Sequence, residues 1–418
     1  SDFNDLWGLH NDGQTGGTVD ADIDAPEAWG IYTGNSNAIV AVIDTGVDYA
    51  HEDLAANIWT NAGEIPGNGI DDDSNGYIDD DKGWDFSTCA DYNSNGTCNV
   101  PKPEDNNPYD DHGHGTHCSG TIGAVGDNGI GVTGVNWGIQ IMPLKFINSH
   151  GEGSTTDVIK AIEYAVDNGA NILSNSWGGD GYSTALREAI VYANVNDVLF
   201  VAAAGNNGTN NDLNPFYPAS YDVANVIAVA ATDHNDNMPS WSNYGSASVD
   251  LAAPGVNVFS TKPGNIYGMS SGTSMSTPHV AGVAGLIRAW DTGLSSLEIK
   301  NAILNNVDAK SSLTDNVLTG GRLNAYKALT SVGCTHLPVR IMGAGTEYPT
   351  LQEAYYTAVT GDTIQSQMGI LNEALIFNQN KSVSIYGGYD CSYTENIDRD
   401  TTLSGTMTIS NGTVTIGN

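Results

Sequence analysis

Residues 272–279 read Gly272-Thr273-Ser274-Met275-Ser276-Thr277-Pro278-His279 and place a serine among small residues, directly before an apolar run. Two other short, glycine-containing segments share this character: Asp44-Thr45-Gly46 and His114-Gly115-Thr116-His117. In nucleophilic catalysis, a histidine accepts the serine proton and an aspartate orients the histidine. Singly, such segments are often helix caps or ordinary loops. Together they predict a catalytic set of Asp44, His114 and Ser274.

Working outward from these segments, apolar runs alternate with helical patterns. Residues 38–43, 195–204 and 226–231 are predicted buried strands, and residues 154–168 and 185–193 are predicted helices. This alternation predicts an α/β fold with a mostly parallel sheet covered on both faces. Functional groups in such folds gather at the carboxyl ends of the strands, where Asp44 and Asn206 are expected.

The last 85 or so residues differ in character, so we expect two domains, residues 1–333 and residues 334–418. A short helix is predicted near residue 350. Short strand-like pieces separated by Gly, Asn and Asp follow at residues 363–365, 374–377, 382–386, 406–409 and 413–416. This pattern resembles the cap and first rungs of a right-handed parallel β-helix, a small all-β segment that buries little on its own.

The order Asp, His, Ser and the three segments resemble the subtilisin-like serine proteases (subtilases), in particular the large calcium-binding bacterial type. The resemblance covers residues 5 to about 330. It implies a subtilisin-like three-layer fold and a secreted serine endopeptidase acting through an acyl-enzyme. It also assigns Asn206, in Ala203-Ala204-Gly205-Asn206, to stabilising the oxyanion.

Two other functions agree less well with this sequence. One is an inactive subtilase platform that carries a β-helix binding or adhesion module, against which the complete catalytic set argues. The other is an esterase of the α/β-hydrolase type. The order of the three residues differs from that of such esterases, and the sequence has no Gly-x-Ser-x-Gly elbow.

The resemblance also identifies a peptide-binding groove. One wall of the first specificity pocket is formed by Ser176, Trp177 and Gly178, followed by Gly179. The facing wall is Ala203, Ala204 and Gly205, and the edge that pairs with an extended substrate is Gly151, Glu152 and Gly153. Glycines and alanines predict a wide, apolar pocket, so we expect broad specificity with a preference for large apolar or aromatic side chains.

The acidic segment at residues 71–80 predicts a calcium site. It places oxygen ligands at alternate positions with Gly76 sixth, like the first half of an EF-hand loop: Asp71, Asp73, Asn75 and the carbonyl of Tyr77. Lys82 stands at the closing position, so Asp79 or Asp80 must complete the shell. A second calcium site is implied by the resemblance, with the ligands Asp53, Val125, Asn128, Ile130 and Val132.

Composition and cysteines limit the partners and the compartment. Fourteen Lys and Arg against 49 Asp and Glu give a net charge of −35, which disfavours nucleic acid and anionic membranes. No apolar run is long enough to span a membrane, and we expect a monomer acting on proteins or peptides. Cys89 and Cys98 bracket a polar loop, and Cys334 and Cys391 form the natural second pair, so disulfides and an oxidising, extracellular compartment are predicted. Cys118 is left as a buried packing residue.

Overall fold

The computed structural model describes residues 2–334, 336–393 and 401–417. The chain forms two compact units. The first contains residues 1–289 and 295–331, and the second contains residues 290–294 and 332–418. The main division therefore falls after Ser331, two residues before the boundary expected from composition.

The first unit is built on a nine-stranded sheet with the order β12-β13-β9-β8-β7-β6-β1-β5-β2. All neighbouring pairs are parallel except β12 and β13. The strands are β1 (Ile39–Asp44), β2 (Trp84–Asp85), β5 (Gln140–Lys145), β6 (Ile172–Asn175), β7 (Leu199–Ala203), β8 (Val226–Thr232), β9 (Leu251–Pro254), β12 (Asp308–Ala309) and β13 (Gly321–Arg322). The parallel α/β fold with helices on its faces is confirmed.

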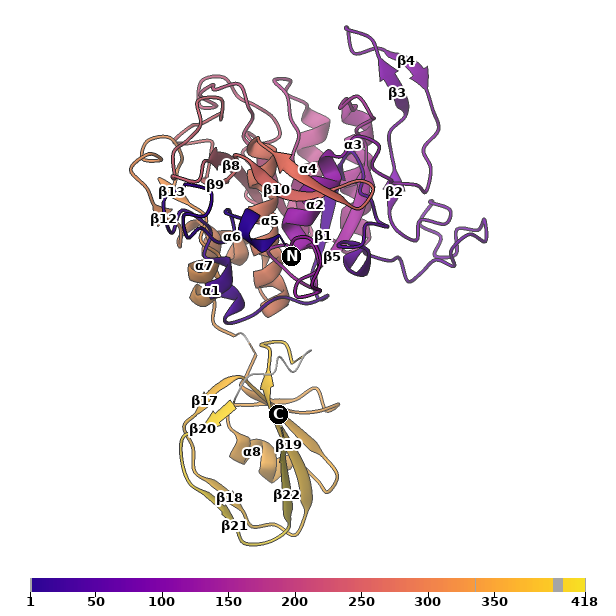
Figure 1. Ribbon diagram of the computed structural model, residues 1–418. Helices are drawn as coiled ribbons and strands as arrows, with labels where there is room; N and C mark the ends of the chain where they lie inside the picture. The colour runs from indigo at the N-terminus through magenta and orange to yellow at the C-terminus, as the bar shows by residue number, and fades with distance from the viewer. Residues whose placement is uncertain (1, 335, 394–400, 418) are drawn as a thin grey trace. The chain divides into compact units, whose positions relative to one another are not determined.

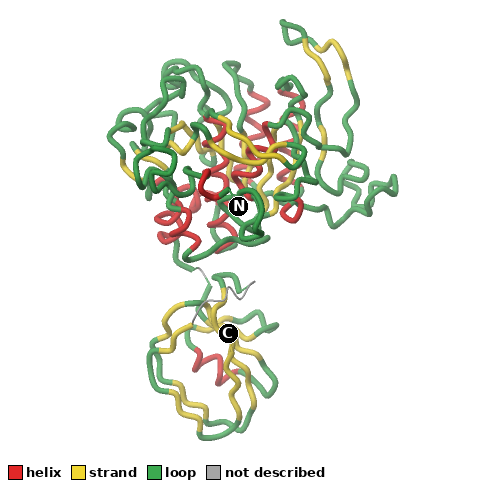
Figure 2. The backbone as a smooth tube through the Cα atoms, in the orientation of Figure 1, coloured by secondary structure: helices red, strands yellow, loops and turns green. Residues whose placement is uncertain are grey.

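Helices cover both faces of this sheet (Figures 1 and 2). The unit contains α1 (Ala25–Trp29), α2 (His114–Gly123), α3 (Thr155–Asp167), α4 (Thr184–Val195), α5 (Thr273–Trp290), α6 (Ser296–Leu304) and α7 (Ala325–Ser331), with 3-10 turns at Phe3–Asp5 and Ala55–Asn57. Along β1, Ala41 and Ile43 pack into the core cluster that contains Ala161 and Ile162 of α3. A side chain on Gly285 of α5 would meet Val40, so α5 approaches the opposite face of β1.

The helix ends follow local sequence signals. Ser154 caps α3 by accepting a hydrogen bond from the Asp157 N–H, and Ser295 with Glu298 forms a reciprocal capping box at α6. The strand predicted to begin at Val195 begins at Leu199 instead, because α4 continues through Val195.

Chain order reverses around β1, which lies between β5 and β6. Open parallel sheets bind ligands at such a switch point, beyond the carboxyl ends of the strands. Asp44 is the last residue of β1, and Asn206 follows the end of β7 at Ala203. The topology therefore brings these two residues to the same edge of the sheet.

Two hairpins lie outside the main sheet. Strands β3 (Cys89–Tyr92) and β4 (Cys98–Pro101) project from the unit and are closed by the Cys89–Cys98 disulfide, as predicted (Figure 1). Strands β10 (Val258–Lys262) and β11 (Ile266–Ser270) form the second hairpin, against which α2 packs.

The second unit is a short coil of parallel strands that follows an antiparallel start. Strands β16, β19 and β22 form one parallel ladder, β17 with β20 a second, and β18 with β21 a third (Figure 1). Its elements are β14 (Val339–Ile341), β15 (Glu347–Tyr348), α8 (Leu351–Thr357), β16 (Thr363–Gln367), β17 (Gly369–Leu371), β18 (Leu375–Phe377), β19 (Ser382–Tyr389), β20 (Thr401–Leu403), β21 (Met407–Ile409) and β22 (Thr413–Gly417). Cys334 and Cys391 are bonded, as predicted.

Within the described residues, no helix is both long and apolar enough to cross a membrane.

Candidate active site

The site begins with a contact between the end of β1 and the start of α2. Nδ1 of His114 lies 2.7 Å from Oδ1 of Asp44. Asp44 is buried, whereas the His114 side chain remains 26% exposed. A carboxylate at this position holds the Nδ1 proton, which leaves Nε2 of the imidazole free to accept a proton from a neighbouring group.

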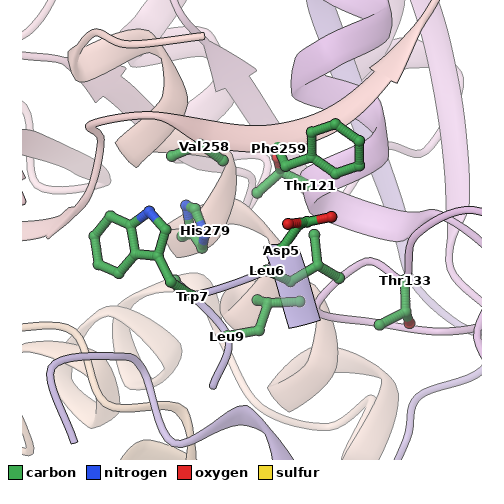
Figure 3. A pocket seen from close by; sticks show the side chains of 10 residues that line it. Asp5, Leu6, Trp7, Leu9, Thr121, Thr133, Val258, Phe259 and His279 are labelled. Carbon is green, nitrogen blue, oxygen red and sulfur yellow. The ribbon is translucent and has the colours of Figure 1, made fainter. Parts of the chain in front are cut away.

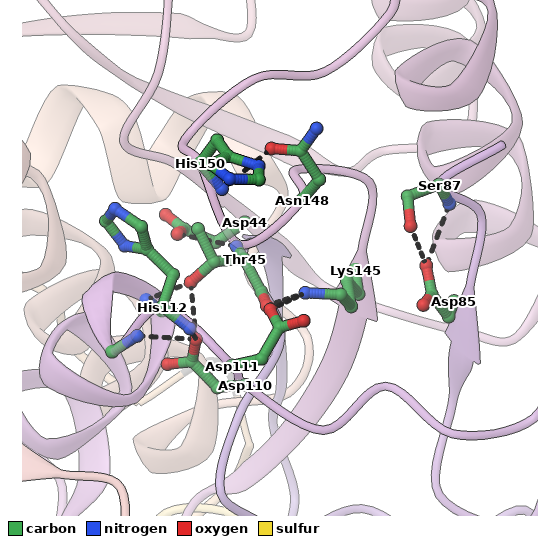
Figure 4. Close-up of polar contacts among 12 residues, drawn as sticks. Asp44, Thr45, Asp85, Ser87, Asp110, Asp111, His112, Lys145, Asn148 and His150 are labelled. Atoms are coloured by element: carbon green, nitrogen blue, oxygen red, sulfur yellow. Dashed lines mark hydrogen bonds and ion pairs between the residues drawn. The ribbon is translucent and has the colours of Figure 1, made fainter. Parts of the chain in front are cut away.

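Asp110 fixes the loop that leads into α2 (Figure 4). Its Oδ1 accepts hydrogen bonds from the Thr45 hydroxyl (2.9 Å) and from the Gly113 N–H (2.7 Å), and its Oδ2 accepts from the Thr116 N–H (2.9 Å). Since Thr45 follows Asp44 and Gly113 precedes His114, one buried carboxylate ties together the two chain segments that carry the pair.

The charges around His114 change its proton affinity. Burial lowers the pKa of the imidazole and so does Lys262, but Asp44, through charge and hydrogen bond, and then Asp110 outweigh them. The net result is a pKa above the ordinary value of 6.5. The carboxylates therefore stabilise the protonated form of the His114 imidazole.

Ser274 lies in the first turn of α5, which begins at Thr273. Its hydroxyl donates to the carbonyl of Ser176 at 3.0 Å, and the Ser176 hydroxyl donates to the carbonyl of Ser274 at 2.9 Å. Among the described residues, Ser176 and not His114 is therefore the hydrogen-bond partner of the nucleophile candidate.

The side chain of Cys118 lies close to both Ser274 and the Asp44–His114 pair. Its sulfur lies within 4.8 Å of ligand atoms of both Asp44 and His114, and its S–H donates to the Ser274 carbonyl at 3.4 Å. Burial raises the pKa of this thiol well above its ordinary value, so it is neutral. Cys118 is thus a buried packing residue beneath the site, as the sequence predicted.

The side-chain amide of Asn206 is held in place through its oxygen. Its Oδ1 accepts from the N–H of Thr273 at 2.8 Å and from the Thr273 hydroxyl at 3.0 Å. This leaves the Nδ2 protons available beside Ser274. The N–H of Ser274, in the first turn of α5, has no partner within its own helix. An ideal Cβ built on Gly272 would lie 3.5 Å from Asn206 Nδ2 and 3.6 Å from the Ser274 nitrogen, so the two donors border one space, as an oxyanion requires.

The two predicted walls of the first specificity pocket both approach the ring of Phe216. A Cβ built on Gly178 would lie 2.3 Å from Cε1 of Phe216, and one on Gly205 would lie 3.0 Å from Cδ1 of the same ring. The expectation of a wide pocket omitted Phe216. Nothing in the local sequence signals that the loop before Pro218 returns to these glycines.

The predicted substrate-pairing edge is exposed at Gly151, Glu152 and Gly153. Asn148 fixes this loop: its N–H donates to the Glu152 carbonyl at 2.8 Å, and its Oδ1 accepts from the Glu152 N–H at 3.1 Å. Beside this edge a surface pocket of about 260 Å³ opens, whose lining includes Phe146, Val158, Trp177, Leu186 and Tyr217. Sequence reasoning missed this second pocket, because its residues come from separate elements.

The predicted EF-hand-like loop forms a cluster of carboxylates. Oxygens of Asp71, Asp73 and Glu64 lie within 4.8 Å of one another. Buried Asp80 accepts hydrogen bonds from Asn61 at its Oδ1 and from Asn75 at its Oδ2, both at 3.0 Å. Asp79 accepts from the N–H groups of Asn68 and Gly69, and Oδ2 of Asp80 also accepts from the Tyr164 hydroxyl, so both aspartates have protein donors and the choice between them stays open.

Glu64 is the residue of this cluster that the sequence did not reveal. It is buried, and its two oxygens accept hydrogen bonds from the N–H groups of Asp72, Asp73 and Asp79. It precedes Asp71 by seven residues and belongs to no recognised spacing. Tyr77, whose carbonyl was the predicted ligand, packs its ring against Trp84 and Phe86.

The residues of the second predicted calcium site also lie together. Asp53 is buried, and its carboxylate accepts from the Asn128 side-chain amide (2.6 Å) and from the Val132 N–H (2.8 Å). The Val125 N–H donates to the Asp53 carbonyl, and the Ile130 N–H donates to Oδ1 of Asn128. The loop thus presents N–H groups to Asp53, so a bound cation would require these groups to reorient.

A small enclosed space lies near the N-terminal segment, lined by Leu6, Trp7, Val258 and His279 among others (Figure 3). Its volume of about 10 Å³ is at the lower limit for one water molecule. This cavity therefore holds no substrate, and the chemistry belongs to the edge of the sheet.

The fold and the site together define a hydrolase with a serine nucleophile. The chain belongs to the subtilase family, whose profile matches residues 35–327, and it is a serine endopeptidase. It is 41% identical over 307 residues to thermitase of Thermoactinomyces vulgaris, covering 73% of this chain and 93% of that protein. It is 38% identical to a thermophilic serine proteinase of Bacillus sp. (strain AK1), covering 72% of this chain and 64% of that protein. It is also 36% identical to subtilisin Savinase of Lederbergia lenta, covering 73% of this chain and 96% of that protein.

Proposed function

We propose that this chain is a secreted serine endopeptidase in which Ser274 is the nucleophile, His114 the general base and acid, and Asp44 its orienting carboxylate. The observation that carries this assignment is the 2.7 Å contact between His114 Nδ1 and Asp44 Oδ1. It lies at the strand edge where Ser274 and Asn206 also meet.

In the proposed mechanism, Ser274 Oγ rotates away from Ser176 and attacks the scissile carbonyl carbon while its proton passes to His114 Nε2. Asn206 Nδ2 and the Ser274 N–H donate to the resulting oxyanion. His114 then returns the proton to the leaving amine, which departs and leaves an acyl-enzyme. Water, deprotonated by His114, attacks the ester carbonyl, and collapse of the second tetrahedral intermediate frees the acid and restores Ser274.

The proposed substrate is a protein or peptide that lies extended along residues 151–153. Its apolar side chains would enter the pocket between the Ser176–Gly178 and Ala203–Gly205 walls and the pocket beside Trp177. A preference for apolar residues with broad specificity agrees with these linings. We infer that one chain suffices, because Asp44, His114, Asn206 and Ser274 all come from it.

We also propose that calcium stabilises the enzyme, with Glu64, Asp71, Asp73 and Asp80 as the first site. None of these four carboxylates has a Lys or Arg partner among the residues that the structure describes. Carboxylate oxygens are the ligands that Ca²⁺ prefers, and the cluster runs from buried Glu64 and Asp80 through half-buried Asp71 to exposed Asp73. The Asp53 loop is the proposed second site. Secretion is supported by the two disulfides.

The test is labelling by a fluorophosphonate together with turnover of casein. The natural protein is expected to lose activity as it is labelled. Ser274→Ala should fold, resist labelling and show nearly no turnover, whereas the control Ser271→Ala, on the exposed residue nearby, should retain both properties. Full activity of Ser274→Ala would overturn the assignment. A protein that neither labels nor cleaves would favour the inactive-platform alternative, which no observation now supports.

A further inference from the structure

Phe216 lies where the first specificity pocket would otherwise continue inward. Its ring is close to Gly178 on one wall, since Cε1 and Cζ would lie 2.3 and 2.9 Å from an added Cβ there. It is also close to Gly205 on the facing wall, at 3.0 Å from Cδ1. One aromatic ring therefore lies close to both walls, and at Gly178 the ring and the Tyr217 carbonyl leave no room for a Cβ.

The loop that carries Phe216 is anchored on both sides of the ring. Tyr217 and Gly179 exchange backbone hydrogen bonds, each 2.8 Å long. The N–H of Phe216 donates to the Ser220 hydroxyl at 3.1 Å, and its carbonyl accepts from the Ser220 N–H at 2.9 Å. Since the wall residue Gly179 itself holds the loop, the backbone that carries the ring cannot withdraw without breaking these hydrogen bonds.

We propose that Phe216 shortens the first specificity pocket, so that the enzyme prefers a small apolar residue such as alanine before the scissile bond over phenylalanine or tyrosine. This inference rests on the proposed catalytic assignment. An aromatic substrate side chain needs the volume that the Phe216 ring occupies, and a packed interior resists such insertion. A small side chain meets the edge of the ring and is fully covered.

The experiment compares kcat/KM for tetrapeptide p-nitroanilides that differ only in the last residue, Ala, Leu or Phe. For the natural protein, we expect the Ala substrate to exceed the Phe substrate by at least roughly tenfold, because pocket contacts of this size discriminate by 10–200-fold. In Phe216→Gly the Phe substrate should gain at least roughly tenfold, and the order should reverse. In Phe216→Ala, kcat/KM for the Phe substrate should change in the same direction. This variant retains a Cβ and takes the place of Phe216→Gly if the glycine variant folds poorly.

Leu213→Ala is the matched control, since Leu213 lies in the same stretch of chain and is 77% exposed. It should leave the Ala-to-Phe ratio unchanged. The inference is overturned if the natural protein cleaves the Phe substrate as well as the Ala substrate, or if the ratio is the same in Phe216→Ala as in Leu213→Ala. If the natural protein cleaves none of the three peptides, the catalytic assignment has failed. Cleavage with the wrong preference refutes only the role of Phe216.

Discussion

Nδ1 of His114 and the backbone N–H of Thr45 both lie 2.7 Å from the same oxygen of Asp44, Oδ1. The second oxygen, Oδ2, is buried without a hydrogen-bond partner among the described residues. The carboxylate is thus held through one atom by its own neighbour in sequence and by the histidine. This leaves the imidazole a single orientation and fixes its tautomer.

The pKa of His114 predicts the acid limb of the pH–rate profile. His114 must be neutral to accept the serine proton, so kcat/KM falls as pH drops through its pKa. Burial lowers that pKa, but Asp44 and Asp110 raise it above 6.5, so the midpoint should lie above about 6.5. Lys262→Gln removes a charge that lowers it and should move the midpoint to higher pH. Lys160→Gln, remote from the site, should not. A midpoint that moves to lower pH in Lys262→Gln contradicts this account.

The fixed amide of Asn206 predicts a loss in turnover rather than in binding. Removing one oxyanion donor costs about 10²–10³ in kcat in a subtilisin, and we expect Asn206→Ala to behave similarly with KM little changed. The neighbouring, exposed Asn207 is the control, and Asn207→Ala should stay near natural activity. Equal kcat values for the two variants would remove Asn206 from the mechanism.

The carboxylate cluster predicts a calcium-dependent melting temperature. A ligand bound only to the folded state stabilises it by mass action, so chelation should lower Tm. Glu64→Gln should lower Tm more in calcium than after chelation, because the loss of one backbone N–H acceptor acts in both conditions. Glu188→Gln, on the exposed surface of α4, is the control. If chelation lowers Tm of the natural protein and of Glu64→Gln equally, Glu64 is not a ligand.

Two buried histidines predict a loss of stability in acid. Burial lowers the pKa of His279 to about 4 and that of His117 to about 3, from 6.5. Between pH 6.5 and these lowered pKa values, the unfolded chain binds more protons than the folded protein. The free energy of unfolding therefore falls as pH drops from about 6.5 toward about 4, by up to about 1.4 kcal/mol per pH unit for each group. We expect His279→Gln, in the Ser274→Ala background with saturating calcium, to flatten the dependence seen in urea unfolding.

The control for this experiment is His150→Gln, because His150 is exposed. Its slope between pH 7 and pH 5 should match that of the background protein. Identical slopes in all three proteins would show that the acid sensitivity arises elsewhere.

The division after Ser331 predicts that the catalytic function resides in the first unit. A chain truncated after Ser331 should still cleave a short peptide, because its proposed catalytic and groove residues all precede that point. It is compared with the full chain in which Cys334→Ser and Cys391→Ser remove the disulfide of the second unit. A truncated protein that folds but does not cleave the peptide would make the second unit part of the active enzyme.

Apolar runs and capping residues predicted most of the fold, because they indicate which segments are buried and where helices begin. The run before Asp44 was recognised as a strand from its apolar residues, and Ser154 and Ser295 marked helix starts. The catalytic candidates could be predicted because three short, glycine-containing segments carry Asp44, His114 and Ser274 in the order typical of subtilases. Phe216 and Glu64 were missed because their roles arise only when the loops close onto distant segments. The partner of the Ser274 hydroxyl, Ser176, was likewise set by packing rather than by sequence.

The order of the strands has a consequence for when activity can appear. Asp44 reaches its place only after β1 has paired with β5 and β6, whose residues are synthesised about a hundred positions later. Arg322 closes the unit by donating to the carbonyl of Asp20, 302 positions away. Such long-range pairing makes folding slow. A partly folded molecule therefore lacks an assembled catalytic set, and a nascent chain cannot digest its neighbours before its own sheet is complete.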